Sequence, residues 1–168
     1  MEITTDVMLR GTEWSKAIDN LSSIFKTRPH YSIFMLAASI GILYDQRIDK
    51  PEENGEEPKT VPRTVLQNQN NDNGRLEVMF QAAILSTATE TYSEDERLEL
   101  AFDEKRIFNR IGFLTPFANF GVTKLNECIG DTTIETMDNI KDYLFSTIEG
   151  RNLEIDALPD DILLTEQS

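Results

Sequence analysis

The sequence has few of the side chains on which catalysis and metal binding most often depend. Its 168 residues include a single histidine, a single cysteine and a single tryptophan. His30 stands beside Arg28 and Tyr31 near an expected helix start, where a lone histidine is usually a surface or first-turn residue without catalytic partners. Cys128 falls on the apolar stripe of another expected helix, a position typical of a buried and inert thiol.

Other absences exclude further classes of enzyme. The chain has no glycine-rich phosphate loop and no Gly-Lys-Ser/Thr motif, which argues against an intrinsic NTPase. It has no Glu-x-x-His pair of the kind that builds a di-metal helical bundle. The acids at 94–96 are explained by the first turn of a helix, where negative charge is favoured. We therefore expect no enzymatic activity, no cofactor and no metal.

Positive charge is scarce in this sequence. Lysine and arginine together number 16 against 30 aspartate and glutamate residues, so the formal net charge is −14. Such a surface repels DNA phosphates, and we expect no direct nucleic-acid binding by the chain alone. A net acidic surface suits solubility or contact with a basic partner.

Two further absences bear on the compartment and the membrane. One cysteine cannot form an internal disulfide, which favours a reducing environment. The first residues, MEITTDVMLRG, lack the basic region and the apolar run of a secretory signal. No apolar stretch approaches the roughly 20 residues of a membrane span. We expect a cytoplasmic chain that does not enter a membrane.

Apolar residues recur with helical periodicity in six segments. This pattern predicts an all-α or mostly α fold: a compact bundle of about six helices, with at most one short strand pair. Apolar residues cover much of the circumference of the second helix, so we expect that helix to be central. The six predicted helices cover residues 13–25, 29–44, 75–89, 93–112, 115–130 and 132–150.

Capping signals mark several of these ends. Ser93 and Glu96 can satisfy each other's backbone N–H groups in a capping box, and a second box is predicted at 132–135. The Thr-Pro pair at 115–116 predicts a helix start, because proline suits the first helical position. Gly112 is predicted to end the preceding helix in the left-handed conformation.

The remaining segments define the predicted domain organisation. Residues 45–74 form an acidic, polar loop, in which 60–66 is a short strand or a helical turn. Together with the six helices this loop makes one helical domain over 1–150. The tail, 151–168, alternates acids with leucine and isoleucine, so it is either flexible or docks along a partner as an extended peptide.

Two small basic clusters stand out against the acid. One precedes the second helix, and the other lies late in the fourth. The second cluster has two interpretations: it complements the helix dipole and pairs with Glu99 or Asp103, or it contacts phosphate or an acidic partner. The predicted partner-binding residues are Lys26, Arg28, Lys105, Arg106 and Arg110, with the tail residues Leu158, Ile162, Leu163 and Leu164.

Short phrases in the chain resemble a known family. An Ile-Phe-Lys-Thr phrase at 24–27 precedes a helix with a phenylalanine, paired alanines and a glycine, and a Phe-Ala-Asn-Phe-Gly phrase follows at 117–121. In that helix the matching residues are Phe34, Ala37, Ala38 and Gly41, and the basic residue that follows the helix is Arg47. These phrases resemble the small bacterial proteins called DNA phosphorothioation-associated protein 4, found with dnd-type modification and restriction systems. The chain departs from that pattern in its longer acidic loop and in its tail.

The resemblance implies a role in bacterial phage defence and supplies no catalytic residues. We expect a non-catalytic accessory subunit that scaffolds or regulates a larger ATPase, nuclease or modification enzyme in a hetero-oligomer. An alternative is an acidic DNA mimic that blocks a DNA-binding enzyme. A third, an enzyme, is the least favoured. A subunit needs an exposed apolar patch, a mimic needs a regular array of carboxylates, and an enzyme needs polar groups that converge in a pocket.

Overall fold

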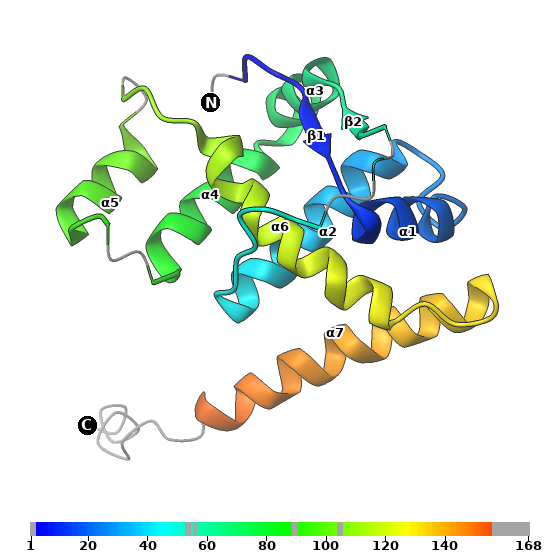
Figure 1. The fold of residues 1–168 in the computed structure, drawn as a ribbon. Coiled ribbons are helices and arrows are strands. Elements are labelled where there is room, and N and C mark those ends of the chain that lie inside the picture. Colours follow the sequence, from blue (N-terminus) through cyan, green and yellow to red (C-terminus); the bar gives the residue numbers. More distant parts are fainter. Residues whose placement is uncertain (1–2, 53–54, 56, 89–90, 104–105, 156–168) are drawn as a thin grey trace, which may run out of the picture. The chain divides into compact units, whose positions relative to one another are not determined.

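The computed structural model describes residues 3–52, 55, 57–88, 91–103 and 106–155, with 148–155 as backbone only. Within these residues the chain forms seven helices and one two-stranded sheet (Figure 1). The predicted mostly α fold with a short strand pair is confirmed, with one helix more than expected. The elements are β1 (Val7–Leu9), α1 (Thr12–Leu21), α2 (Pro29–Tyr44), β2 (Lys59–Val61), α3 (Arg63–Asn73), α4 (Arg75–Ser86), α5 (Glu94–Phe102), α6 (Arg110–Glu127) and α7 (Thr133–Ile155).

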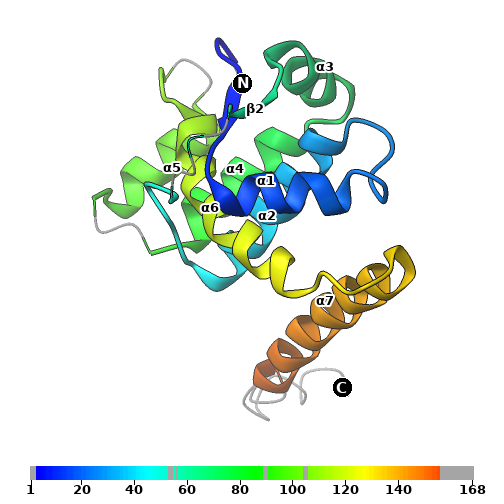
Figure 2. The ribbon, with the colours of Figure 1, turned by 45° about the vertical axis from the view of Figure 1, so that its right-hand side comes forward.

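The chain divides into two compact units, Met1–Glu127 and Cys128–Ser168. The centre of the first unit is the pair α2 and α6, which lie against each other in both ribbon views (Figures 1 and 2). A Cβ atom added at Gly41 would overlap the carbonyl oxygen of Phe117, and one added at Gly121 would overlap that of Ala37. The absence of side chains at these two glycines therefore lets the two helix backbones touch.

Large apolar side chains surround this crossing. Trp14, Phe34, Phe80 and Phe117 are fully buried, as bulky residues in a close-packed core should be. The buried Trp14 indole donates to Asn119 Oδ1 over 2.9 Å, so its one polar atom is satisfied. The interior of the first unit is thus filled from α1, α2, α4 and α6.

The apolar stripes of the predicted helices predict a core of ten residues: Phe34, Leu36, Ala37, Ile40, Phe80, Phe102, Phe117, Phe120, Ile140 and Leu144. Phe34, Ala37, Ile40, Phe80, Phe117 and Ile140 are buried, whereas Leu36, Phe120 and Leu144 are only half-buried. Phe102, at the end of α5, is 62% exposed. Periodicity identified the apolar stripe of each predicted helix but not the part of that stripe that a neighbour covers.

The segment predicted as one acidic loop, 45–74, contains two regular elements. β2 pairs antiparallel with β1, with Val7 opposite Val61. The polar run at 63–73 forms α3, which buries only Leu66 among its side chains. That single anchor explains why a search for an apolar stripe missed this helix.

The predicted boundary between the fourth and fifth helices is wrong. α5 ends at Phe102, and α6 begins at Arg110, so Gly112 and Pro116 both lie inside α6. The helix starts earlier because the side-chain oxygen of Asn109 accepts a hydrogen bond from Gly112 N over 2.9 Å, as an N-cap does.

The predicted capping box at the start of α5 is confirmed. The Ser93 hydroxyl accepts from the backbone N–H of Glu96 over 3.3 Å. In return the Glu96 carboxylate accepts from the backbone N–H of Ser93 over 2.9 Å. Both polar groups at this helix end are therefore satisfied by sequence-local partners.

The second unit contains α7. Its predicted capping box is half-formed: the Thr132 hydroxyl accepts from Glu135 N over 3.1 Å, but the Glu135 carboxylate accepts from Asp131 N rather than Thr132 N. Gly150 does not end the helix, which continues to Ile155 and crosses the predicted boundary between domain and tail.

Candidate interaction surface

The basic cluster predicted late in the fourth helix is divided by the structure. Arg110 is only 6% exposed, because it forms an ion pair with Glu77 of α4 and its guanidinium lies 5.1 Å from the centre of the Phe80 ring. A side chain held in this way joins α6 to α4. Its predicted role in partner binding stays a prediction, and the contacts that Arg110 makes here are structural.

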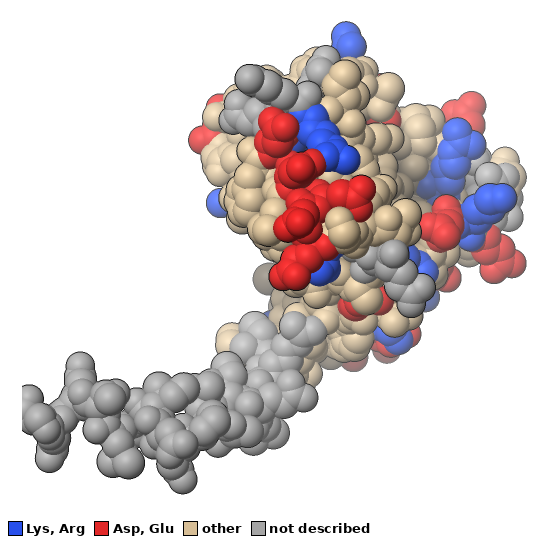
Figure 3. Space-filling view, turned by 90° about the vertical axis from the view of Figure 1, so that its left-hand side faces the viewer, with Lys and Arg blue, Asp and Glu red and all other residues tan. Residues whose placement is uncertain are grey.

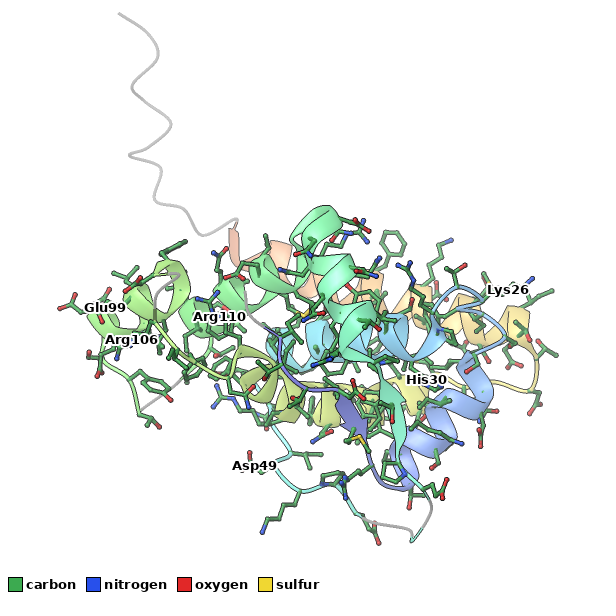
Figure 4. All side chains as sticks on the ribbon, turned by 90° about the horizontal axis from the view of Figure 1, so that it is seen from above. Lys26, His30, Asp49, Glu99, Arg106 and Arg110 are labelled. Carbon is green, nitrogen blue, oxygen red and sulfur yellow. The ribbon has the colours of Figure 1, made fainter. Side chains whose placement is uncertain are left out.

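Arg106 remains on the surface. It forms an ion pair with the exposed Glu99 of α5, and Figure 4 shows the two side chains together. This pairing was one of the two interpretations of the cluster, and an exposed pair of this kind adds little stability. Lys105 lies outside the described residues, as do Leu158, Ile162, Leu163 and Leu164 of the tail.

The first basic cluster lies elsewhere on the first unit. Lys26 and Arg28 are exposed and directly precede α2, and Figure 4 shows Lys26 on the side opposite to Arg106. Arg28 occupies the left-handed conformation, with a φ of 55°, at the N-cap of α2. These two residues lie between Phe25 and Tyr31 in the sequence, and Phe25 and Tyr31 line a cavity of the first unit.

That cavity is an open groove of about 720 Å³ between α2 and α4. We call it the α2–α4 groove. One wall is the side of α2 that does not face α6, and the other is the outward side of α4. Its lining residues are Phe25, Tyr31, Ser32, Met35, Leu36, Ser39, Ile42, Asn73, Arg75, Val78, Met79 and Ala82.

Helical spacing explains why one helix serves both the core and the groove. On α2, Phe34, Ala37 and Gly41 are buried. Met35 and Ile42 lie on another face of the same helix, where they are half-buried. α2 is therefore apolar all round, but α6 covers only part of it.

The wall made by α4 is more exposed. Val78 is 62% exposed and Ala82 is also exposed, while Leu76 and Phe80 on the inner face of α4 are fully buried. The groove residues of α4 recur at intervals of three and four, which places them on one face of the helix. Contiguous exposed apolar side chains of this kind often mark a protein-binding surface.

The groove differs in charge from the rest of the chain. Among its lining residues none is acidic, and the one charged residue is Arg75, the first residue of α4. Tyr31 is 8% exposed, and its buried hydroxyl has no hydrogen-bond partner among the described residues. Burial raises the pKa of Tyr31 above its ordinary value, and the nearby positive charges of Arg75 and Arg28 oppose that rise.

The histidine and the cysteine have ordinary surroundings. His30 Nδ1 lies 2.9 Å from the carbonyl oxygen of Thr60, which ties the start of α2 to β2. Cys128 is buried and takes part in no disulfide. Among the described residues no group of three or more histidine, cysteine, aspartate or glutamate side chains could hold a metal ion. Within the same residues, no helix has the length and apolar character needed to cross a bilayer.

Several of the residues that carry the family resemblance lie in the core, whereas Lys26 and Arg47 are exposed. Ala37 and Gly41 on α2 meet Phe117 and Gly121 on α6 at the close helix crossing. Arg47 lies over the Phe117 ring, 4.4 Å from its centre, and donates to Thr87 Oγ1 and Ala88 O at the end of α4. These contacts concern packing within the first unit, while Phe25 of the Ile-Phe-Lys-Thr phrase lines the α2–α4 groove.

Acidic side chains gather on a different face of the first unit, over α5 (Figure 3). The exposed acids of α5 and its C-cap are Glu94, Asp95, Glu96, Glu99 and Asp103. Arg97 and Arg106 interrupt this band, since Arg97 lies within α5 and Arg106 pairs with Glu99. The carboxylates thus form a local band on a single short helix.

Comparisons with family models, curated proteins and solved structures give no match to this chain.

The α2–α4 groove was not predicted from the sequence, because no motif marks it. Two signals bear on it in hindsight: the second helix is apolar on more than one side, and Val78 and Ala82 follow Arg75 at helical spacing.

Proposed function

We propose that this chain is a non-catalytic accessory subunit that binds a larger protein through the α2–α4 groove. One observation carries the proposal: α2 packs one face tightly against α6 and leaves another apolar face open beside the exposed Val78 and Ala82 of α4. An uncovered apolar face on an otherwise well-packed unit is favourable when a partner buries it.

The biological setting of the proposal comes from the sequence resemblance. That resemblance supports a bacterial anti-phage or DNA modification–restriction complex, with a larger ATPase, nuclease or modification enzyme as the partner in a hetero-oligomer. The single cysteine supports a cytoplasmic location for this complex. The net charge of −14 supports a subunit that binds protein and does not bind DNA by itself.

The test is a comparison of two tagged full-length chains in the native host. Ala82→Arg places a long cation in the groove at an exposed helical position. We expect the wild-type chain to co-purify with a larger defence protein and the Ala82→Arg variant to lose it, with unchanged circular dichroism. A variant that retains the partner in full would exclude the groove as the binding surface.

A DNA mimic is the second candidate, because the exposed acids of α5 form a band (Figure 3). A mimic would use this band to occupy a basic cleft. Glu94→Lys combined with Asp95→Lys should then abolish inhibition of a DNA-binding enzyme. The two arginines within the band make this candidate weaker than the groove.

A further inference from the structure

The α2–α4 groove has a positive end and an apolar length, and together they indicate what it binds. Tyr31, in the first turn of α2, and Arg75, the first residue of α4, line the same groove, and Arg28 is the N-cap of α2; the positive charges of Arg75 and Arg28 both act on the Tyr31 hydroxyl. The N-termini of α2 and α4 therefore lie at the same end of the groove. Each N-terminus carries partial positive charge from its helix dipole, which adds to the two guanidinium groups.

The apolar length of the groove matches a short helix. Its lining on α2 runs from Tyr31 to Ile42, which corresponds to about 16 Å at the rise of an α-helix. Met35, Leu36 and Met79 supply apolar surface along that length, and methionine adapts readily to different partner side chains. The opposite wall presents Val78 and Ala82 at helical spacing.

One further observation at the positive end also points to a ligand. The Tyr31 hydroxyl is buried without a hydrogen-bond partner among the described residues. A buried hydroxyl without a hydrogen-bond partner is unfavourable, because it has lost its contacts with water. A carboxylate placed between Arg28 and Arg75 would supply an acceptor close to this donor.

We propose that the groove binds one amphipathic helix of a partner protein, with carboxylates at its C-terminal end beside Arg28 and Arg75. This inference rests on the proposed function and specifies the partner segment. The apolar face of the bound helix packs between α2 and α4. Its C-terminal end carries partial negative charge, so this orientation opposes its dipole to those of α2 and α4.

The occupant is a peptide helix because the groove is a trough walled by two helices. A groove of this kind suits anchors spaced at three and four residues. The absence of any acidic side chain from the lining, in a chain of net charge −14, favours an acidic partner over a basic one at this site.

The experiment measures the binding of labelled synthetic helices of about 15 residues by fluorescence anisotropy, with the full-length chain as receptor. All peptides share one leucine face. The first carries three glutamates in its last turn, the second has the same composition with the glutamates in its first turn, and the third has three lysines in its last turn. The two glutamate peptides differ only in the end that carries the charge.

We expect the first peptide to bind at least about fivefold more tightly than the second, as one good charge contact allows. Arg75→Glu should weaken the first peptide by about tenfold and strengthen the third, since the pair of opposite charges is then restored. Lys16→Glu, at an exposed position of α1 outside the groove, is the matched control. It should change binding by less than about twofold.

Three results would overturn the inference: equal binding of the two glutamate peptides, equal effects of Arg75→Glu and Lys16→Glu, or no binding of any peptide to the wild-type chain. Circular dichroism of each variant verifies that it is folded. The proposed function fails separately, when Ala82→Arg retains the native partner in full.

Discussion

Two faces of the same helix can be compared directly in this protein. On one face α2 meets α6 so closely that Gly41 and Gly121 must lack side chains. Another face of α2 lines the open α2–α4 groove, where its methionine and isoleucine side chains are half-buried. The comparison teaches that apolar character alone does not distinguish a core face from a binding face. The neighbour that covers each face makes the distinction.

The largest loss of stability is expected from a substitution in the contact between α2 and α6. Gly121→Val places a branched side chain against the carbonyl of Ala37 in a crossing that has no spare room. Overpacking of this kind, with backbone as the obstacle, should destabilise the protein by more than about 3 kcal/mol. Urea denaturation measures the loss. Ser39→Ala, on the open face of α2, is the control and should change the free energy of unfolding by less than about 0.5 kcal/mol.

The second-largest loss of stability is expected from breaking the ion pair that joins α6 to α4, the helix that forms the second wall of the groove. Arg110→Met removes one ionic partner of the Glu77 carboxylate, which is only 22% exposed. We expect a loss of about 2–4 kcal/mol in unfolding free energy, near the range for breaking a buried ion pair. Arg106→Met breaks an exposed pair and should lose under about 1 kcal/mol. Equal losses from the two substitutions would contradict the structural role of Arg110.

A smaller effect concerns α5, which packs against α4. Ser93→Ala removes the hydroxyl that caps α5. The expected loss is about 1 kcal/mol, measured by thermal or urea unfolding. Ser86→Ala, at an exposed position of α4, serves as the comparison and should be close to neutral. A larger loss at Ser86 than at Ser93 would show that the box does not stabilise α5.

The same cap has a pH dependence. Hydrogen bonds from the backbone N–H and the hydroxyl of Ser93 hold the pKa of Glu96 below its ordinary value. A lowered pKa means that the ionised form is the one stabilised by folding. Its contribution is present above the ordinary glutamate pKa of about 4.3 and is lost as the pH falls through the lower folded value. The stability difference between wild type and Glu96→Gln should therefore shrink between about pH 6 and pH 3. A constant difference over that range would contradict it.

The smallest effect on stability is expected on the open wall of the groove. Val78→Ser changes a side chain that is 62% exposed, so unfolding should shift by less than about 0.5 kcal/mol. The same variant should bind the glutamate-ended helix more weakly than wild type does, because an apolar anchor is lost. A variant that is unchanged in both measurements would remove Val78 from the binding surface.

The sequence was most informative where local chemistry determines structure. The limits of α2 and the capping box at Ser93 follow from proline, serine and glutamate positions that act within one helical turn. α6 was misjudged because Pro116 imitates a helix start, while the true cap at Asn109 lies seven residues earlier. Local signals compete, and tertiary packing selects among them.

The candidate site was not predictable by the same means. Arg110 pairs with Glu77, which lies 33 residues earlier in the sequence. No local pattern could therefore predict that this arginine is buried. The groove likewise arises only when α2 and α4 are brought together in the fold. From the first basic cluster, the sequence correctly placed Lys26 and Arg28 at the start of α2, but not the apolar length beyond them.

The close contact of α2 with α6 also has a kinetic consequence. The helix that forms one wall of the groove is held by backbone contact with α6 at Gly41, so the proposed binding site would have this wall in place before any partner arrives. A preformed wall gives up little conformational freedom on association. Encounter with a partner helix should then proceed without waiting for the receptor to rearrange, and changes in affinity among groove variants should be found mainly in the dissociation rate.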